Sequence, residues 1–296
     1  MRSPDLLQPS ALDGDVPVAL DQYSWRFLAE GDSWFSLGSL NPFKNANLTN
    51  NLEFLRKTCV LTCAQPGDTL RHMSEMGSDP WFQHLLFGNR AQPWSAILLS
   101  AGGNDLIDAA RVLPSGAAAG DASLRLLLKP EEWGPASLGV SRFISASGWQ
   151  RFEAYLTSNY EHLISMRDDP NSQSQGVPIF THTYAFPTPR NAPSGPIGPW
   201  LYPAMRQYQL PVTEWIAISR ELLTRLGNAL KTIAADQQRF PNVQVFDSAQ
   251  AADIEPARLG DTEVSGDWAN EIHLTRKGCA KLARAWSKEI DQVLKS

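Results

Sequence analysis

The sequence predicts an α/β protein built as a three-layer α/β/α sandwich around a central parallel sheet of about five strands. Two observations carry this prediction. Five short stretches are continuously apolar and end in polar or glycine-containing turns, and amphipathic helical patterns alternate with them. A strand that is apolar throughout is buried on both faces, as in parallel sheets covered by helices. In such sheets ligands bind at the carboxyl ends of the strands, where these turns gather.

Each predicted strand is a run of four to eight residues that stops at a turn signal. The first ends at Glu30-Gly31-Asp32-Ser33, the second at a Pro-Gly-Asp sequence, and the third at Ala101-Gly102-Gly103-Asn104-Asp105. The five strands are residues 25–28, 59–64, 96–100, 177–184 and 243–246.

Two helices are clear from apolar residues spaced three and four apart. One covers residues 214–235, with Thr213 as the expected N-cap. The other fills the C-terminus, and Thr275 is its expected N-cap. One face of this second helix carries Cys279, Leu282, Trp286, Ile290 and Val293.

Composition excludes several classes of protein. The chain has 296 residues, 43% of them hydrophobic, and a formal net charge of -5, which is typical of a folded domain and not of a disordered chain. No cluster of Lys and Arg suggests nucleic acid or an anionic membrane as a partner. No secretory signal and no apolar run of membrane-spanning length is present, so we expect a cytoplasmic protein. The three cysteines are expected to be buried free thiols and not a zinc site.

Residues 21–296 are predicted to form a single domain, preceded by a flexible arm at residues 1–20. Two stretches interrupt the regular alternation. Residues 106–175 form a long, partly helical excursion, and residues 185–212 form a proline-rich loop. Because long loops in compact domains are usually functional, both are candidate walls of a substrate site.

The turns at the strand ends carry residues suited to nucleophilic catalysis. A serine hydroxyl needs a base within hydrogen-bond reach, and histidine has a suitable pKa, so Ser33 and His273 are the candidate pair. A tetrahedral oxyanion needs donors already aimed at it. The candidates are the backbone N–H groups of Ser33 and Gly67 and the side-chain amide of Asn104.

Four short sequence motifs, taken together, resemble those of the SGNH (GDSL-type) hydrolase family. They are Gly31-Asp32-Ser33-Trp34, Gly67 in its turn, Gly102-Gly103-Asn104-Asp105, and His273 before the C-terminal helix. Any single block could be an ordinary turn or a surface histidine, but all four occur in family order. The resemblance implies a flavodoxin-like fold, a Ser33 nucleophile and oxyanion roles for Gly67 and Asn104. Among the other histidines, only His182 ends a predicted strand and could face the same cleft.

The residue that orients His273 departs from the family pattern. The family places an aspartate three residues before the catalytic histidine, and this chain has Asn270 there. Asparagine can accept the ring N–H but cannot stabilise the imidazolium by charge. Asp267, Glu271 or a backbone carbonyl could substitute. Glu271 is the less attractive carboxylate, since a residue beside a turn is commonly solvated.

The sequence therefore predicts a serine hydrolase that cleaves an acyl or acetyl ester, or a thioester, through a Ser33 acyl-enzyme with His273 as general base. The expected substrate is a small-molecule or glycan ester, with no metal and no cofactor. The alternative is a catalytically weakened binding module on the same scaffold, for which Asn270 is the evidence. Oligomeric state and acyl length are left open by the sequence.

Overall fold

The computed structural model describes the chain apart from residues 14–15, 37–45, 76, 78–79 and 296. Its centre is one parallel sheet of six strands in the order β1-β3-β2-β4-β5-β6. The strands are β1 (Asp5–Leu7), β2 (Trp25–Gly31), β3 (Thr58–Thr62), β4 (Ala96–Ser100), β5 (Ile179–His182) and β6 (Val243–Phe246). The five predicted strands are all present, and β1 is the additional one.

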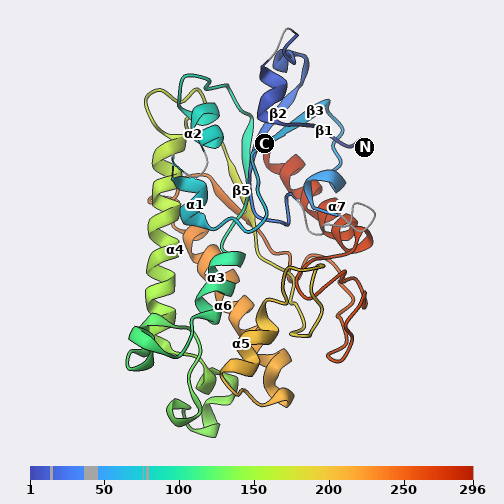
Figure 1. Cartoon of the computed structure of the whole chain (residues 1–296). Coiled ribbons are helices and arrows are strands. Elements are labelled where there is room, and N and C mark those ends of the chain that lie inside the picture. The colour runs from blue at the N-terminus through green and yellow to red at the C-terminus, as the bar shows by residue number, and fades with distance from the viewer. Residues whose placement is uncertain (14–15, 37–45, 76, 78–79, 296) are drawn as a thin grey trace.

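Helices cover both faces of this sheet, which confirms the α/β/α sandwich (Figure 1). They are α1 (Leu70–Ser74), α2 (Pro80–Leu86), α3 (Gly103–Arg111), α4 (Ala146–Arg167), α5 (Leu201–Gln207), α6 (Trp215–Ala235) and α7 (Arg276–Val293). The 3₁₀ segments are Pro9–Leu12, Leu20–Gln22, Thr49–Asn51, Gly116–Ala119, Ala122–Leu124, Pro130–Glu132, Ala136–Phe143 and Val212–Glu214.

Two neighbouring residues of β5 show how the layers are assigned. Successive strand side chains point to opposite faces of a sheet. Thr181 lies 3.0 Å from the hydroxyl of Tyr160 on α4, whereas the ring of His182 contacts Trp286 on α7, with centroids 5.3 Å apart. Helix α4 therefore covers one face and α7 the other.

The order of the five longer strands, β3-β2-β4-β5-β6, is the flavodoxin-like order, and its topological switch point lies between β2 and β4. These two strands pair in parallel with Gly31 opposite Ser100. A Cβ at residue 31 would come within 2.8 Å of the Ser100 Cβ, so glycine is required for this close approach. The loops that follow β2 and β4 are therefore brought together at the position where such sheets bind ligands.

The two helices predicted from periodicity are confirmed, with one difference at a cap. Thr275 caps α7 by accepting the N–H of Gly278 at 3.2 Å. At the other helix, residues 212–214 form a 3₁₀ turn that leads directly into α6. Thr213 thus lies inside this turn and does not cap the helix.

The N-terminal segment differs from the flexible arm expected over residues 1–20. Asp5–Leu7 pairs in parallel with β3, with Leu6 opposite Val60. The Tyr23 hydroxyl donates to Asp5 at 2.8 Å, and Pro9 is buried. The described part of this segment is therefore an edge of the sheet. Its three strand residues are too few, and too mixed in polarity, to give a strand signal in the sequence.

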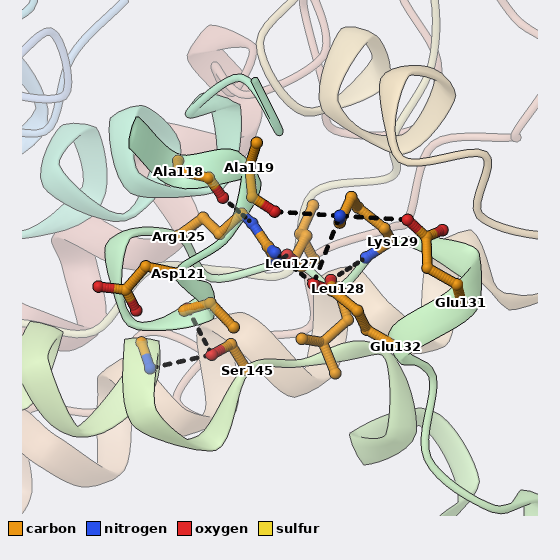
Figure 2. Close-up of polar contacts among 12 residues, drawn as sticks. Ala118, Ala119, Asp121, Arg125, Leu127, Leu128, Lys129, Glu131, Glu132 and Ser145 are labelled. Atoms are coloured by element: carbon orange, nitrogen blue, oxygen red, sulfur yellow. Dashed lines mark hydrogen bonds and ion pairs between the residues drawn. The ribbon is translucent and has the colours of Figure 1, made fainter. Parts of the chain in front are cut away.

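The excursion at residues 106–175 is organised by a buried arginine between α3 and α4 (Figure 2). The Arg125 guanidinium donates to the carbonyls of Ala118 (3.0 Å) and Leu127 (3.1 Å) and to the Glu132 carboxylate (2.6 Å). Ser145 caps α4 and donates to the carbonyl of Ala122 at 2.6 Å. These bonds hold the irregular part of the excursion as ordered structure and position α4.

Cys59, Cys63 and Cys279 are buried, as predicted, and within the described residues none of them forms a disulfide. Among the residues with described positions, no helix combines the length and apolar character needed to cross a bilayer.

Candidate active site

Ser33 lies in a tight turn directly after β2. The Asp32 carboxylate accepts the N–H of Trp34 at 2.9 Å, and the Asp32 carbonyl accepts the N–H of Phe35 at 3.1 Å. A short aspartate that bonds the backbone two residues onward is a local reason for this chain to turn. The turn places Ser33 beyond the carboxyl end of the sheet.

Ser33 and His273 are 240 residues apart in sequence and in direct contact in the structure. His273 Nε2 lies 2.7 Å from the Ser33 Oγ, and its Nδ1 lies 2.9 Å from the Asn270 Oδ1. The same Asn270 oxygen accepts the backbone N–H groups of Ile272 (3.1 Å) and His273 (2.9 Å). Because Asn270 presents an acceptor to Nδ1, the ring proton belongs on Nδ1, which leaves Nε2 free to accept the serine proton.

The environment of His273 keeps its ring neutral. Burial lowers the pKa of His273 to about 4, well below the usual value of about 6.5. The Trp200 indole packs nearly perpendicular to this ring, with centroids 5.1 Å apart. At neutral pH, therefore, this histidine is in the form that can take a proton.

Asp267, the alternative orienting residue, lies away from the imidazole. Its carboxylate accepts the N–H of Glu255 at 2.9 Å and pairs with Lys281 at 2.6 Å. Burial opposes ionisation of Asp267, but the hydrogen bonds and the two nearby lysines outweigh it and lower the pKa. Asp267 is thus a partner of α7, and the atom facing Nδ1 belongs to Asn270.

Glu271, expected to be solvated, is fully buried. Its carboxylate accepts four backbone N–H groups of the proline-rich stretch, those of Arg190, Trp200, Leu201 and Tyr202. Burial raises the pKa of Glu271 to about 7 despite these bonds. We call this contact the Glu271 clamp. It joins the turn that carries His273 to the stretch that carries Trp200.

Arg190 strengthens the same junction. It is completely buried, and its guanidinium donates to the carbonyls of Asn270 at 2.7 Å and Asp261 at 3.0 Å. The sequence gives no local signal for the clamp or for Arg190, because their partners are backbone groups about 70 to 80 residues away.

The three predicted oxyanion donors come from separate loops at one end of the sheet. The Asn104 amide donates to the Asp68 carbonyl at 3.0 Å, which ties it to the Gly67 turn. Gly67 has φ +88°, a backbone conformation that favours glycine. Within the described part of the chain, the backbone N–H groups of Ser33 and Gly67 make no hydrogen bond, so both can donate to a ligand.

Asp105, the neighbour of Asn104, also holds the Gly67 turn. Its carboxylate accepts the N–H of Leu70 at 3.1 Å, at the start of α1, and the hydroxyl of Tyr155 at 2.5 Å. Asn104 and Asp105, two consecutive residues of α3, therefore both form hydrogen bonds with the loop that carries Gly67. This second contact was not anticipated from the sequence.

A second group of serine, histidine and aspartate lies beneath Ser33. The Ser100 hydroxyl donates to Asp32 at 2.7 Å, and its oxygen lies 3.0 Å from Nε2 of His182. The Tyr184 hydroxyl donates to the other Asp32 oxygen at 2.6 Å. Burial raises the pKa of Asp32 to about 6 and lowers that of His182 to about 4. Ser100 and His182 have no exposed surface, so His182 supports the floor of the site and does not face the cleft.

An apolar cavity of about 30 Å³ adjoins Ser33 and Asn104. Its other lining residues are Asp32, Trp34, Gly103, Leu106, Ile107, Tyr184, Ala185, Pro187, Leu201, Leu223 and Ile272. Among the described residues, no three His, Cys, Asp or Glu side chains are grouped so that they could hold a metal ion.

Comparisons with protein-family models and with curated proteins each found no match. Among solved structures, the chain is similar to a carbohydrate acetylesterase from Sinorhizobium meliloti (9% identity, TM-score 0.49, 91% of this chain and 100% of that one). It is also similar to an aryl esterase from M. smegmatis (10%, 0.48, 91% and 99%) and to a lipase from a goat rumen metagenome (11%, 0.47, 90% and 97%). All three TM-scores are below 0.5, so the roles of residues in this chain are argued from its own geometry.

Proposed function

We propose that the protein is a serine hydrolase that cleaves an ester bond through a Ser33 acyl-enzyme. The observation that carries the proposal is the hydrogen-bonded series Ser33, His273, Asn270 beside a cavity that Ser33 itself lines. A nucleophile, a neutral base and a group orienting that base are the minimum set for acyl transfer by serine.

The reaction proceeds in two halves. The Ser33 Oγ attacks the acyl carbon while His273 Nε2 takes its proton, and the negative oxygen of the tetrahedral intermediate accepts hydrogen bonds from Ser33 N–H, Gly67 N–H and the Asn104 amide. His273 then returns the proton to the leaving alcohol or thiol. A water molecule, activated by His273, attacks the acyl-enzyme in the same way and releases the acid together with free Ser33.

Asn270 limits the expected turnover rate. Its carbonyl oxygen selects the productive tautomer of His273 but carries no charge to stabilise the imidazolium that forms in each half-reaction. Together with burial, this makes His273 a weak base. We therefore infer slow turnover on a correctly assembled site.

The expected substrates are small-molecule or glycan esters. The site needs only an acyl carbon within reach of Ser33, a leaving group beside His273 and an oxygen facing the three donors. Trp200 lies against His273 and is half-buried, so it offers an aromatic surface to the leaving group. Aromatic surfaces suit both sugar rings and aryl alcohols.

Hydrolysis of p-nitrophenyl acetate tests the proposal directly. Ser33→Ala removes the nucleophile and is expected to lower kcat/KM by at least about 10³-fold. Ser100→Ala is the matched control, because it removes a hydroxyl from the buried group beneath the site and is expected to keep activity within about tenfold. Equal rates for wild type and Ser33→Ala would overturn the proposal, and loss of activity in Ser100→Ala alone would move the nucleophile to Ser100.

The alternative is a binding module that keeps the scaffold without turnover, and Asn270 is the observation that favours it. A binding module would retain affinity for an ester in both wild type and Ser33→Ala while hydrolysing it in neither. Isothermal titration with a slowly hydrolysed ester, run beside the hydrolysis assay, separates the two functions.

A further inference from the structure

The cavity beside Ser33 has apolar walls to which three helices contribute. Leu106 and Ile107 come from α3, Leu201 from α5 and Leu223 from α6, and each of these side chains is at most 8% exposed. Tyr184 also lines the cavity, and its hydroxyl already donates to Asp32. The walls formed by Leu106, Ile107, Leu201 and Leu223 offer no hydrogen-bond partner, so a polar group placed against them would lose water without compensation, and this part of the cavity suits hydrocarbon.

The position of the cavity decides which half of an ester can occupy it. It is lined by Ser33, Gly103 and Asn104, so it begins where the attacked carbon and its oxygen must lie. The leaving group must instead stay next to His273 Nε2 and depart toward water after it takes the proton. His273 is not among the residues that line this cavity, so the leaving group lies outside it, whereas an acyl chain attached to Ser33 can occupy it.

The size of the cavity limits the length of that chain. Its volume is about 30 Å³, and one water-sized group needs roughly 10–15 Å³ on this measure. The cavity therefore holds two or three non-hydrogen atoms beyond the carbonyl carbon. That corresponds to the methyl group of acetyl, the ethyl group of propionyl and, at the limit, the propyl group of butyryl.

We propose that this cavity is the acyl pocket of the enzyme and restricts it to esters of short acids, from two to four carbons. This inference rests on the proposed ester hydrolysis at Ser33. It identifies Ile107, Leu201 and Leu223 as specificity-determining residues, because they form the walls that a longer chain would have to displace. Closely packed interiors resist such displacement, since every added methylene forces neighbouring side chains away from their preferred rotamers.

The test is a series of p-nitrophenyl esters from acetate through butyrate and hexanoate to octanoate. For wild type, kcat/KM is expected to stay within about tenfold from acetate to butyrate and to fall at least about 100-fold by octanoate, because one misplaced methylene in a hydrophobic pocket changes kcat/KM by roughly 10–200-fold. Ratios between esters are used because they do not depend on the fraction of protein that is folded.

Leu223→Ala enlarges the pocket and is expected to raise the hexanoate-to-acetate ratio at least tenfold. Leu222→Ala is its matched control, because Leu222 is the adjacent residue of α6, is fully buried and does not line the cavity; its ratio should equal that of wild type. Ala185→Val narrows the pocket and should lower the butyrate-to-acetate ratio.

The outcomes separate this inference from the proposed function. Wild-type hydrolysis of octanoate as fast as acetate, lost in Ser33→Ala, would overturn the short-acyl pocket while leaving the hydrolase intact. The same conclusion follows if Leu223→Ala and Leu222→Ala shift the ratio equally. Absence of Ser33-dependent hydrolysis for every ester in the series would instead overturn the proposed function.

Discussion

At the scale of single residues, the most informative position is the asparagine that faces the imidazole of the proposed general base, His273. Asn270 accepts from Nδ1 at 2.9 Å and also from two backbone N–H groups of its own turn. Geometry and tautomer are thus maintained while the negative charge is absent. The sequence indicated that the orienting residue lies shortly before His273 but did not distinguish Asn270 from Asp267. The choice depends on which of the two side chains projects toward the imidazole, and this is set by the conformation of the turn.

The pH dependence of hydrolysis should report the environment of His273. Only the neutral ring can take the serine proton, and its pKa in the folded protein is about 4. Activity is therefore expected to be full well above pH 4 and to be lost as the pH falls through that value. The measurement is kcat/KM for p-nitrophenyl acetate between pH 3.5 and 8. An acid limb centred near pH 6.5 would show that the ring is not desolvated as described.

Asn270→Asp should shift the acid limb of the pH profile to higher pH. A carboxylate at the Asn270 position favours the imidazolium and typically raises the pKa of such a histidine by roughly one to three units. The acid limb should shift toward neutral pH, and kcat at pH 8 should increase. Asp267→Asn is the control, because its carboxylate contacts Lys281 and not His273; it should leave the limb in place. A shift with Asp267→Asn and none with Asn270→Asp would contradict the assignment.

At the scale of elements, the site is assembled by contacts between loops that follow different strands. Asn104 and Asp105, at the start of α3, hold the Gly67 turn, and the Glu271 clamp holds the proline-rich stretch against the His273 turn. The apolar periodicity of the sequence predicted the helices and strands, because the buried face of each element appears as regularly spaced apolar residues within a short stretch of sequence. It could not predict the Glu271 clamp, because the partners of Glu271 are backbone N–H groups, which do not depend on the type of residue that carries them.

Asp105→Asn is expected to impair catalysis by loosening the Gly67 turn. The Leu70 N–H bonds both carboxylate oxygens and Tyr155 OH bonds one of them, so an amide donor in place of one oxygen opposes one of these groups and weakens a buried bond at a cost of about 1–3 kcal/mol. We expect kcat to fall at least about tenfold with little change in KM, since the oxyanion donors act in the transition state. Asp108→Asn, at an exposed position of the same helix, is the control. Equal kinetics for the two variants would show that Asp105 does not position the turn.

Glu271→Gln should release the proline-rich stretch. Glutamine has one acceptor oxygen where the carboxylate has two, and its amide would face backbone donors, so at least one of the four N–H groups loses its partner. The expected loss in the free energy of unfolding is about 1–3 kcal/mol. Limited proteolysis should show faster cleavage within residues 190–202. Unchanged stability and unchanged cleavage would mean that the clamp does not hold this stretch.

At the scale of the whole molecule, the site is closed by nearly the entire chain. Ser33 follows β2, at one end of the sequence, and His273 precedes α7, at the other. The sheet order brings the loops after β2 and β4 together at the switch point, and α7 covers the same region of the sheet. The alternation of continuous apolar strands with amphipathic helices predicted a parallel sheet covered by helices, and the family resemblance implied its flavodoxin-like order. Neither signal predicted β1, whose pairing with β3 depends on a partner about fifty residues away.

The contacts Ser33–His273 and Ser100–His182 distinguish the proposed nucleophile, Ser33, from its nearest alternative, Ser100. Ser33 lines the cavity and faces His273, whereas Ser100 is completely buried and donates to Asp32. Sequence reasoning noted His182 but could not foresee that it packs beneath the site.

Labelling with a fluorophosphonate, followed by digestion and mass spectrometry of the modified peptide, tests the central claim most directly. The probe forms a covalent bond with a serine oxygen that a neighbouring base activates. One adduct is expected, on Ser33, and it should be absent in Ser33→Ala and retained in Ser100→Ala. An adduct on Ser100, or no adduct on folded wild-type protein, would contradict the central claim.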